Sequence, residues 1–256
     1  MRMYNQLMNN LEEMKLYKAK ELMEYYSKAV TDGEKTFIEA MSEIMIQEVK
    51  LRDERAMNAC VKTANFPYLK TDKDFDFDFQ PSINKAQIKD LLSLRFLENN
   101  ENIVFIGTPG TGKTHLATAI GITAAQKRIS TYFITFQELI AQLKKANYEN
   151  RLQEKIKVYT TKYKLLIIDE LGYLEMDDEA ANLFFQLIAK RYESRSTIIT
   201  TNSPFSKWPE IFKNPSLTNA VLDRLLHHSS VISIKGPSYR LKDKLIYDES
   251  STESGK

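Results

Sequence analysis

The segment Gly107-Thr-Pro-Gly-Thr-Gly-Lys113-Thr114 decides the fold of this chain. It matches the P-loop pattern, in which glycine, four residues and a second glycine are followed by lysine and threonine. The apolar run 103–106 before it predicts a buried strand, and residues 115–127 after it have apolar residues at helical spacing. Glycines in such a loop let backbone N–H groups face phosphate oxygens, and the helix adds its positive dipole end. A strand, this loop and a helix in this order predict an α/β fold with a phosphate site.

The side chains of the loop give the predicted site its chemistry. Lys113 can reach the β- and γ-phosphates of a nucleotide, and the Thr114 hydroxyl can bind Mg2+. The alternative is a glycine-rich turn that binds nothing, which the flanking strand and helix disfavour. ATP and Mg2+ are therefore the expected cofactors. The residues expected to contact the nucleotide are Gly107, Thr108, Pro109, Gly110, Thr111, Gly112, Lys113, Thr114 and His115.

Composition describes an ordinary globular protein. The chain has 256 residues, of which 43% are hydrophobic and 27% charged, enough for one α/β domain and a small accessory domain. The net charge of +2 implies no partner by itself. Cys60 is the only cysteine, so an internal disulfide is excluded. No apolar run approaches the ~20 residues of a membrane span, and no signal peptide is recognisable, so we expect a cytoplasmic protein without a membrane partner.

Two regions precede the P-loop strand. Residues 1–65 carry helical patterning and are expected to form a three-helix N-terminal domain, with Thr31 and Glu34 as a capping box before the third helix. Periodicity does not decide whether this domain only packs, docks a partner or contacts DNA. Residues 66–84 are expected to be an extended linker whose phenylalanines pack on the core, with a place in the adenine pocket as the alternative.

From residue 85 onward, helices and strands alternate. A helix is expected over 85–97, and the expected strands are 103–106, 130–135, 165–168, 197–201 and 231–234. This alternation is typical of a parallel five-stranded sheet between helices. We therefore predict an ATPase domain over 85–247, followed by a disordered tail at 248–256.

Two acids follow the buried strand 165–168. Carboxyl ends of parallel strands are where open α/β sheets bind ligands, so Asp169 and Glu170 are expected at the phosphate site. Asp169 would hold Mg2+, and Glu170 would orient or deprotonate the attacking water. The alternative is that both acids merely cap the next helix.

Three further polar residues complete a hydrolytic set. Asn202 ends the strand 197–201 and could bond the γ-phosphate or the attacking water, or simply begin a turn. Arg224 lies on a predicted helix, 217–226, and could reach a neighbouring subunit's nucleotide as a finger; the alternative is a pair with Asp223, and Arg191 and Arg195 are rival fingers. Arg240 could contact the γ-phosphate within its own subunit or begin a surface helix. The predicted catalytic residues are Lys113, Glu170, Asn202, Arg224 and Arg240.

A local basic excess indicates nucleic acid. Residues 127–164 hold nine lysines and arginines against three acids, with tyrosines interleaved. Such a patch suits sequence-independent contact with DNA phosphates, although a solvated helix pair is the alternative. Adjacent histidines on a helix point in different directions, so His227 and His228 predict no metal site. The candidate DNA contacts are Lys144, Lys145, Arg151 and Lys155.

These motifs together resemble the IstB-like family, the AAA+ ATPase helper proteins of a class of bacterial insertion sequences, related to DnaC-type helicase loaders. The resemblance covers nearly the full chain. Its narrowest strings are Leu166-Ile-Ile-Asp-Glu-Leu-Gly-Tyr173 and Leu222-Asp-Arg-Leu-Leu-His-His228.

The resemblance implies an ATPase that self-assembles on double-stranded DNA, distorts it and recruits or stimulates a transposase. ATP would then lie between subunits of a homo-oligomer, with Asn202 as sensor 1, Arg224 as the finger and Arg240 as a sensor-2 arginine. Only 54 residues follow Asn202, which favours an AAA+ core with little or no C-terminal lid. The near alternative is a helicase loader that binds single-stranded DNA. More distant alternatives are a small-metabolite kinase and a scaffold without turnover.

Overall fold

The computed structural model describes residues 2–173 and 176–242, and the chain divides into two compact units, residues 1–59 and 60–256. The division falls within helix α3 (Phe37–Thr63), a few residues before the boundary expected at residue 65. The predicted tail, 248–256, lies outside the described residues. None of the helices in the described ranges is long and apolar enough to cross a membrane.

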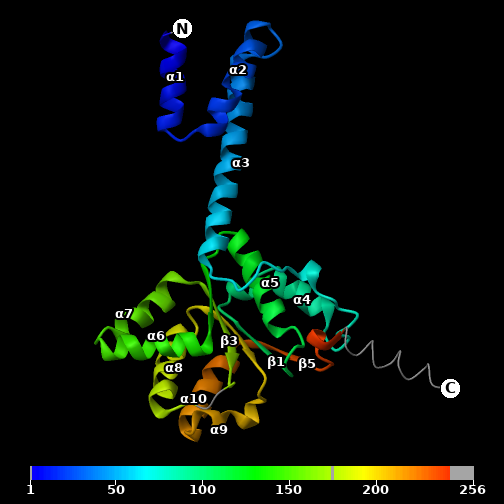
Figure 1. Ribbon diagram of the computed structural model, residues 1–256, viewed down its shortest axis with the longest axis vertical. Helices are drawn as coiled ribbons and strands as arrows, with labels where there is room; N and C mark the ends of the chain where they lie inside the picture. Colours follow the sequence, from blue (N-terminus) through cyan, green and yellow to red (C-terminus); the bar gives the residue numbers. More distant parts are fainter. Residues whose placement is uncertain (1, 174–175, 243–256) are drawn as a thin grey trace, which may run out of the picture. The chain divides into compact units, whose positions relative to one another are not determined.

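The first unit contains α1 (Arg2–Glu13), α2 (Tyr17–Thr31) and most of α3, as labelled in Figure 1. Leu11, Ala19 and Ile44 form its small core. The buried carboxylate of Glu48, on α3, accepts hydrogen bonds from the backbone N–H groups of Lys18 and Ala19 at 2.7 and 2.9 Å. These groups have no partner within α2, so Glu48 caps α2 from a distant part of the sequence.

The capping box before α3 differs from the sequence expectation. Thr31 is the last residue of α2 and does not precede α3. Instead Thr36 accepts from the Glu39 N–H at 3.2 Å, while the Glu39 carboxylate accepts from the Thr36 N–H at 2.8 Å. The expected pair was wrong because the turn between the helices contains five more residues than the pattern suggested.

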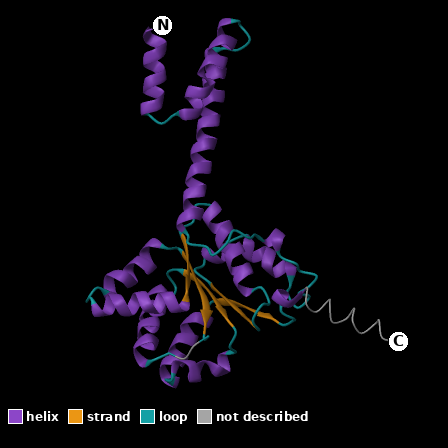
Figure 2. Ribbon diagram, viewed as in Figure 1, coloured by secondary structure: helices purple, strands orange, loops and turns teal. Residues whose placement is uncertain are grey.

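The second unit is built on a parallel sheet, drawn in orange in Figure 2. Its strands lie in the order β2-β3-β4-β1-β5, and every neighbouring pair is parallel, which confirms the predicted fold class. The strand bounds are β1 Asn102–Gly107, β2 Thr131–Thr135, β3 Leu165–Leu171, β4 Ser196–Thr201 and β5 Ser229–Ile234.

Helices cover both faces of this sheet. Ile103 and Phe105 face a core shared with α4 (Lys85–Leu92) and α5 (Lys113–Gln126). Val104, between them in β1, faces the opposite core. Successive side chains of β1 therefore enter the cores on opposite faces of the sheet, as expected for a sheet buried on both sides. The helices of the opposite core are α6 (Phe136–Tyr148), α7 (Leu152–Lys157), α8 (Asp178–Arg191), α9 (Trp208–Phe212) and α10 (Pro215–Leu226).

The helix expected over 85–97 is two helices. Asn84 caps α4 by accepting from the N–H groups of Ala86 and Gln87. Leu94 then takes the left-handed conformation, with φ of 70°, which ends α4 and separates it from the 3-10 helix η2 (Arg95–Leu97). Leucine rarely adopts this conformation, so helical periodicity could not reveal the break.

Within the second unit, the segment 66–84 packs on the core beside the sheet through its aromatic side chains. Phe66, Phe75 and Phe77 lie against the α4–α5 core. Phe79 contacts Tyr239 edge-on, with ring centroids 5.2 Å apart. A 3-10 helix, η1 (Asp72–Asp74), interrupts the extended course. The segment therefore runs beside the P-loop, and its side chains enter the site described next.

Candidate nucleotide-binding site

The P-loop connects β1 to α5 and needs its glycines. Gly110 and Gly112 have φ of 80° and 94°, a region that other residues avoid. A methyl group added at Gly112 would lie 2.4 Å from Phe75 Cε2, and one at Gly110 would lie 2.0 Å from Ser238 Oγ. The loop is therefore enclosed by the segment 66–84 on one side and by the chain after β5 on the other.

Lys113 begins α5 with its side chain folded over the loop. Its Nζ donates to the carbonyl oxygens of Gly107 and Thr108 at 2.7 and 2.8 Å. Burial lowers the pKa of the Lys113 ammonium, and the nearby charge of Asp169 opposes this shift. The ammonium therefore lies over the P-loop at the start of α5, where a cation and the positive end of a helix together suit phosphate.

Asp169 lies at the end of the buried run of β3. It is only 4% exposed, and its carboxylate accepts from the Thr114 hydroxyl at 2.9 and 3.1 Å. Burial raises the pKa of this carboxyl group, and hydrogen bonds from Thr200 and Thr114 oppose the rise. A hydroxyl and a carboxylate oxygen side by side are hard donors of the kind that Mg2+ prefers, so these residues fit that ion.

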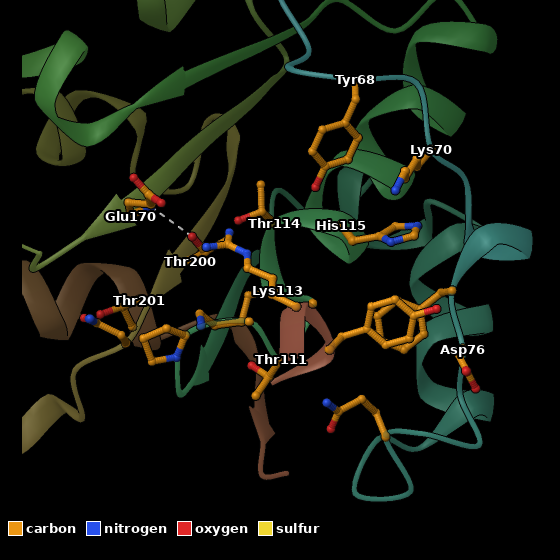
Figure 3. A pocket seen from close by; sticks show the side chains of 18 of the residues that line it. Tyr68, Lys70, Asp76, Thr111, Lys113, Thr114, His115, Glu170, Thr200 and Thr201 are labelled. Carbon is orange, nitrogen blue, oxygen red and sulfur yellow. Dashed lines mark hydrogen bonds between the residues drawn. The ribbon is translucent and has the colours of Figure 1, made fainter. Parts of the chain in front are cut away.

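Glu170 lies at an irregularity in the pairing of β3 with β4. The register between β3 and β4 shifts between Ile168 and Leu171, and Glu170 has a φ of 62°. This places its exposed side chain in the cavity while Leu171 returns to the core. Its backbone N–H donates to the Thr200 hydroxyl at 3.0 Å, the dashed line in Figure 3.

One cavity, of about 520 Å3, brings most of the predicted residues together (Figure 3). Residues 109–115 line it, with Glu170 from β3, Asn202 after β4 and Arg240 after β5. The carboxyl ends of three strands thus meet at the loop, as the parallel sheet requires. The cavity also contains residues that the sequence did not assign to it, namely Tyr68, Lys70, Asp74, Asp76, Gln80, Tyr173, Thr200, Thr201 and Tyr239.

His115 lines the cavity and is held by the segment 66–84. Its Nε2 lies 2.7 Å from the carbonyl oxygen of Thr71, and its ring packs edge-on against Phe75 with centroids 5.3 Å apart. Burial raises the pKa of the Tyr68 hydroxyl, and Asp169 adds to the rise. Three aromatic side chains that line this cavity therefore come from the segment 66–84 and from α5, namely Tyr68, Phe75 and His115.

The three candidate finger arginines lie in different surroundings. Arg224 is half-buried on α10, where it donates to the carbonyl oxygen of Ala220 at 2.9 Å and lies 5.0 Å from the centre of the Phe185 ring. It does not line the cavity of its own subunit. Arg191 is fully buried, and burial lowers the pKa of its guanidinium. Arg195 donates to the carbonyl oxygen of Ser194.

The basic residues between α6 and α7 line a second cavity. Lys145, Arg151 and Lys155 are exposed or half-buried around a hollow of about 400 Å3. Arg151 pairs with Glu149, which also lines this hollow, and Lys144 pairs with Asp177 with its Nζ 3.9 Å from Glu179. The nearby Tyr148 is 90% exposed, as a base-stacking side chain would need to be, whereas Tyr159 is buried.

The two histidines after α10 do not diverge as expected. Helix α10 ends at Leu226, so His227 and His228 lie in the turn before β5. Their ring centroids are 4.0 Å apart, and potential ligand atoms of both lie within 4.8 Å of each other and of Glu193. The expectation that they face different directions was wrong because it assumed a helix at these positions.

The site defines a P-loop ATP-binding protein of the AAA+ type, because the parallel sheet brings the P-loop, the two acids and Asn202 together. The chain belongs to the IstB-like ATP binding protein family, whose model matches residues 9–246. It is 54% identical over 243 residues to an ATP-binding protein of insertion sequence IS232 from Bacillus thuringiensis subsp. berliner, covering 94% of this chain and 96% of the relative. It is 46% identical over 198 residues to the ATP-binding protein of IS21 from Pseudomonas aeruginosa, covering 77% and 74%.

Among solved structures, the chain is similar to the crystal structure of the DnaC helicase loader. The TM-score is 0.53 at 26% identity, covering 68% of this chain and 98% of that one. The family relationship and this neighbour agree with the AAA+ core expected from the sequence. After β5, the described chain to residue 242 contains only the short helix η5 (Tyr239–Leu241) and no helical lid.

Proposed function

We propose that this protein hydrolyses ATP as a helper of an insertion sequence, assembling on duplex DNA in the ATP-bound state and stimulating a transposase. The observation that carries the hydrolytic part is the convergence of Lys113, Glu170 and Asn202 on one cavity. The Glu170 side chain is exposed and lines the same cavity as Lys113, so its carboxylate is available to act on a water beside the phosphates. The insertion-sequence relatives support the biological role.

The proposed roles follow from the geometry of each group. Lys113 and the P-loop amides hold the β- and γ-phosphates, while Thr114 and Asp169 bind Mg2+. Mg2+ neutralises charge on the transferred phosphoryl group when it is bound. Glu170 orients the attacking water, and Asn202 bonds that water or the γ-phosphate. Arg240 lines the same cavity and contacts the γ-phosphate from within the subunit.

Arg224 is proposed to complete the nucleotide site of a neighbouring subunit. This arginine lies outside its own cavity, and within the described residues its guanidinium contacts the Ala220 carbonyl oxygen and the Phe185 ring, so little is lost when it turns toward a neighbour. Such a finger is worth on the order of 10^3 to 10^5 in rate. Arg191 is unsuited to this role because it is buried within the subunit.

The DNA contact is proposed for the surface around the second cavity. Lys145, Arg151 and Lys155 line it, with Tyr148 exposed nearby. Lys144 and Arg151 contribute less than Lys145 and Lys155, because Lys144 is paired with Asp177 and Arg151 with Glu149. Contacts of this kind bind phosphates without reading sequence, so affinity should fall steeply with salt.

A mixing experiment tests the shared site. Arg224→Ala subunits should bind ATP but not hydrolyse it, because they cannot complete a neighbour's site. Glu170→Gln subunits should also be inactive, because they lack the water-orienting carboxylate. When the two are mixed with duplex DNA, some Glu170 sites acquire an Arg224 from the other variant, and hydrolysis should return. No recovery at any mixing ratio, with both variants assembling normally, would contradict a finger that acts in trans.

The second candidate, a helicase loader, is favoured by the similarity to the DnaC structure. The two functions differ in the DNA that they need. A loader should be stimulated by single-stranded DNA and should bind a hexameric helicase. An insertion-sequence helper should be stimulated by duplex DNA and should bind a transposase.

A further inference from the structure

Thr200, on β4, joins the two acids of the site although it was not among the predicted site residues. Its side chain is buried, with 1% of its surface exposed. The hydroxyl donates to Asp169 Oδ1 and accepts from the backbone N–H of Glu170 at 3.0 Å. One hydroxyl group therefore bonds both to the carboxylate proposed to bind Mg2+ and to the backbone of the residue proposed to orient water.

The bond to Glu170 replaces a missing rung of the sheet. Ile168 pairs with Ile199 and Leu171 with Thr201, so Asp169 and Glu170 oppose the single residue Thr200. Glu170 also has a φ of 62°, which a glutamate adopts only when its surroundings hold it there. The Thr200 hydroxyl is the hydrogen-bond partner of its N–H in this distorted stretch.

The bond to Asp169 fixes the orientation of a carboxylate that has another hydroxyl partner. Thr114 also donates to Asp169, but Thr114 belongs to the P-loop and is itself a proposed Mg2+ ligand. When Mg2+ is bound, the Thr114 hydroxyl must direct a lone pair to the ion. The Thr200 hydroxyl does not face this demand, so it can hold Asp169 in either case.

We propose that Thr200 is a positioning residue that holds Asp169 and Glu170 in the relative geometry needed for hydrolysis. This inference rests on the proposed ATPase function. Thr200 borders the cavity, but its hydroxyl is bonded to Asp169 and to the Glu170 N–H, so in this scheme it binds neither the nucleotide nor the water. It acts on hydrolysis through Glu170 and on Mg2+ through Asp169, and should matter little for metal-free nucleotide binding by the P-loop.

The test compares Thr200→Val, which keeps shape and removes the hydroxyl, with Thr200→Ser, which keeps the hydroxyl. Thr197→Val is the matched control, because Thr197 is equally buried on the same strand but bonds to Arg191 instead of the acids. Each full-length variant is assayed for DNA-stimulated ATP turnover, for binding of a non-hydrolysable ATP analogue, and for the rise in melting temperature when Mg2+ is added to that analogue.

Thr200→Val should lower kcat at least tenfold, change analogue affinity without Mg2+ less than threefold, and reduce the Mg2+-dependent rise in melting temperature. Thr200→Ser should stay within about threefold of wild type in all three, and Thr197→Val should keep its kcat. Wild-type turnover by Thr200→Val, or equal losses in the valine and serine variants, would overturn the inference while leaving the ATPase function intact. If the wild type binds the analogue but does not turn over ATP with DNA, the proposed function itself fails and the inference falls with it.

Discussion

Replacing Arg191 by methionine should destabilise the second unit without touching the nucleotide site. The Arg191 guanidinium is buried and donates four hydrogen bonds, to the Thr197 hydroxyl and to the carbonyl oxygens of Tyr159, Tyr163 and Ser196. Methionine fills a similar volume but leaves all four acceptors without this donor. At about 1 kcal/mol for each net bond, the loss is about 4 kcal/mol. Relief of the buried charge reduces it to about 3 kcal/mol.

For a unit of this size, about 3 kcal/mol corresponds to a fall in melting temperature of roughly 6–12 °C. Thermal unfolding followed by circular dichroism measures it directly. The matched control is Arg224→Met, because among residues 2–173 and 176–242 the hydrogen bond of that guanidinium is to one carbonyl oxygen, on its own helix. The control should melt within about 3 °C of wild type.

The two variants should also differ in function. Folded Arg191→Met should bind ATP as the wild type does, whereas Arg224→Met should keep its stability and lose hydrolysis. A melting temperature for Arg191→Met within 2 °C of wild type would refute the reasoning, because it would mean that the cost of burying the charge cancels all four bonds.

Three other changes test separate parts of the site. Lys113→Ala should abolish ATP-dependent assembly measured by light scattering, since the phosphates lose their cation; normal assembly would remove the phosphate assignment. Gly112→Ala should weaken ATP binding at least tenfold in a titration, because its methyl group collides with Phe75, while Gly33→Ala, with no atom within 4 Å, should not. A combined charge reversal should weaken duplex binding and reduce the slope of log affinity against log salt concentration by about three. An unchanged slope would mean that this basic surface does not contact DNA. The residues reversed are Lys145, Arg151 and Lys155.

Local patterns were sufficient for the framework of the second unit. The apolar runs before the P-loop and before Asp169 predicted β1 and β3, because a strand buried on both faces needs a continuous apolar sequence. The other three strands, β2, β4 and β5, were expected from the alternation of strands and helices, whereas the order of the strands in the sheet was not predicted. The acids could be placed at the P-loop because parallel strands end at the same edge.

The parts that sequence did not reveal depend on contacts between distant residues. In the sequence, Thr200 resembles any other strand residue. Its hydroxyl contacts Asp169 and Glu170 because the register shifts between β3 and β4. Glu48 caps α2 from 29 residues away, which no local capping pattern includes. The available signal was a set of polar residues in a strand buried on both faces and ending at Asn202, but Thr200 shares it with Ser196, Thr197 and Thr201.

The histidine pair illustrates a different failure. The direction of His227 and His228 was inferred from helical geometry, but α10 ends one residue earlier. Helix ends are difficult to locate from sequence because they are set by caps and packing rather than by periodicity. The sequence shows two adjacent histidines, but it does not show whether their backbone is helical, and the inference depended on that.

ATP turnover by the wild type and by Glu170→Gln, each at saturating ATP with duplex DNA, tests the central claim most directly. Glu170 is exposed in the cavity, and its backbone supplies the bond to Thr200, so the amide side chain should leave the fold and ATP binding unchanged. We expect DNA-stimulated turnover in the wild type and at least a hundredfold lower turnover in Glu170→Gln, with ATP-bound assemblies persisting on DNA. Equal turnover in the two proteins would contradict the assignment of Glu170 and with it the hydrolytic site.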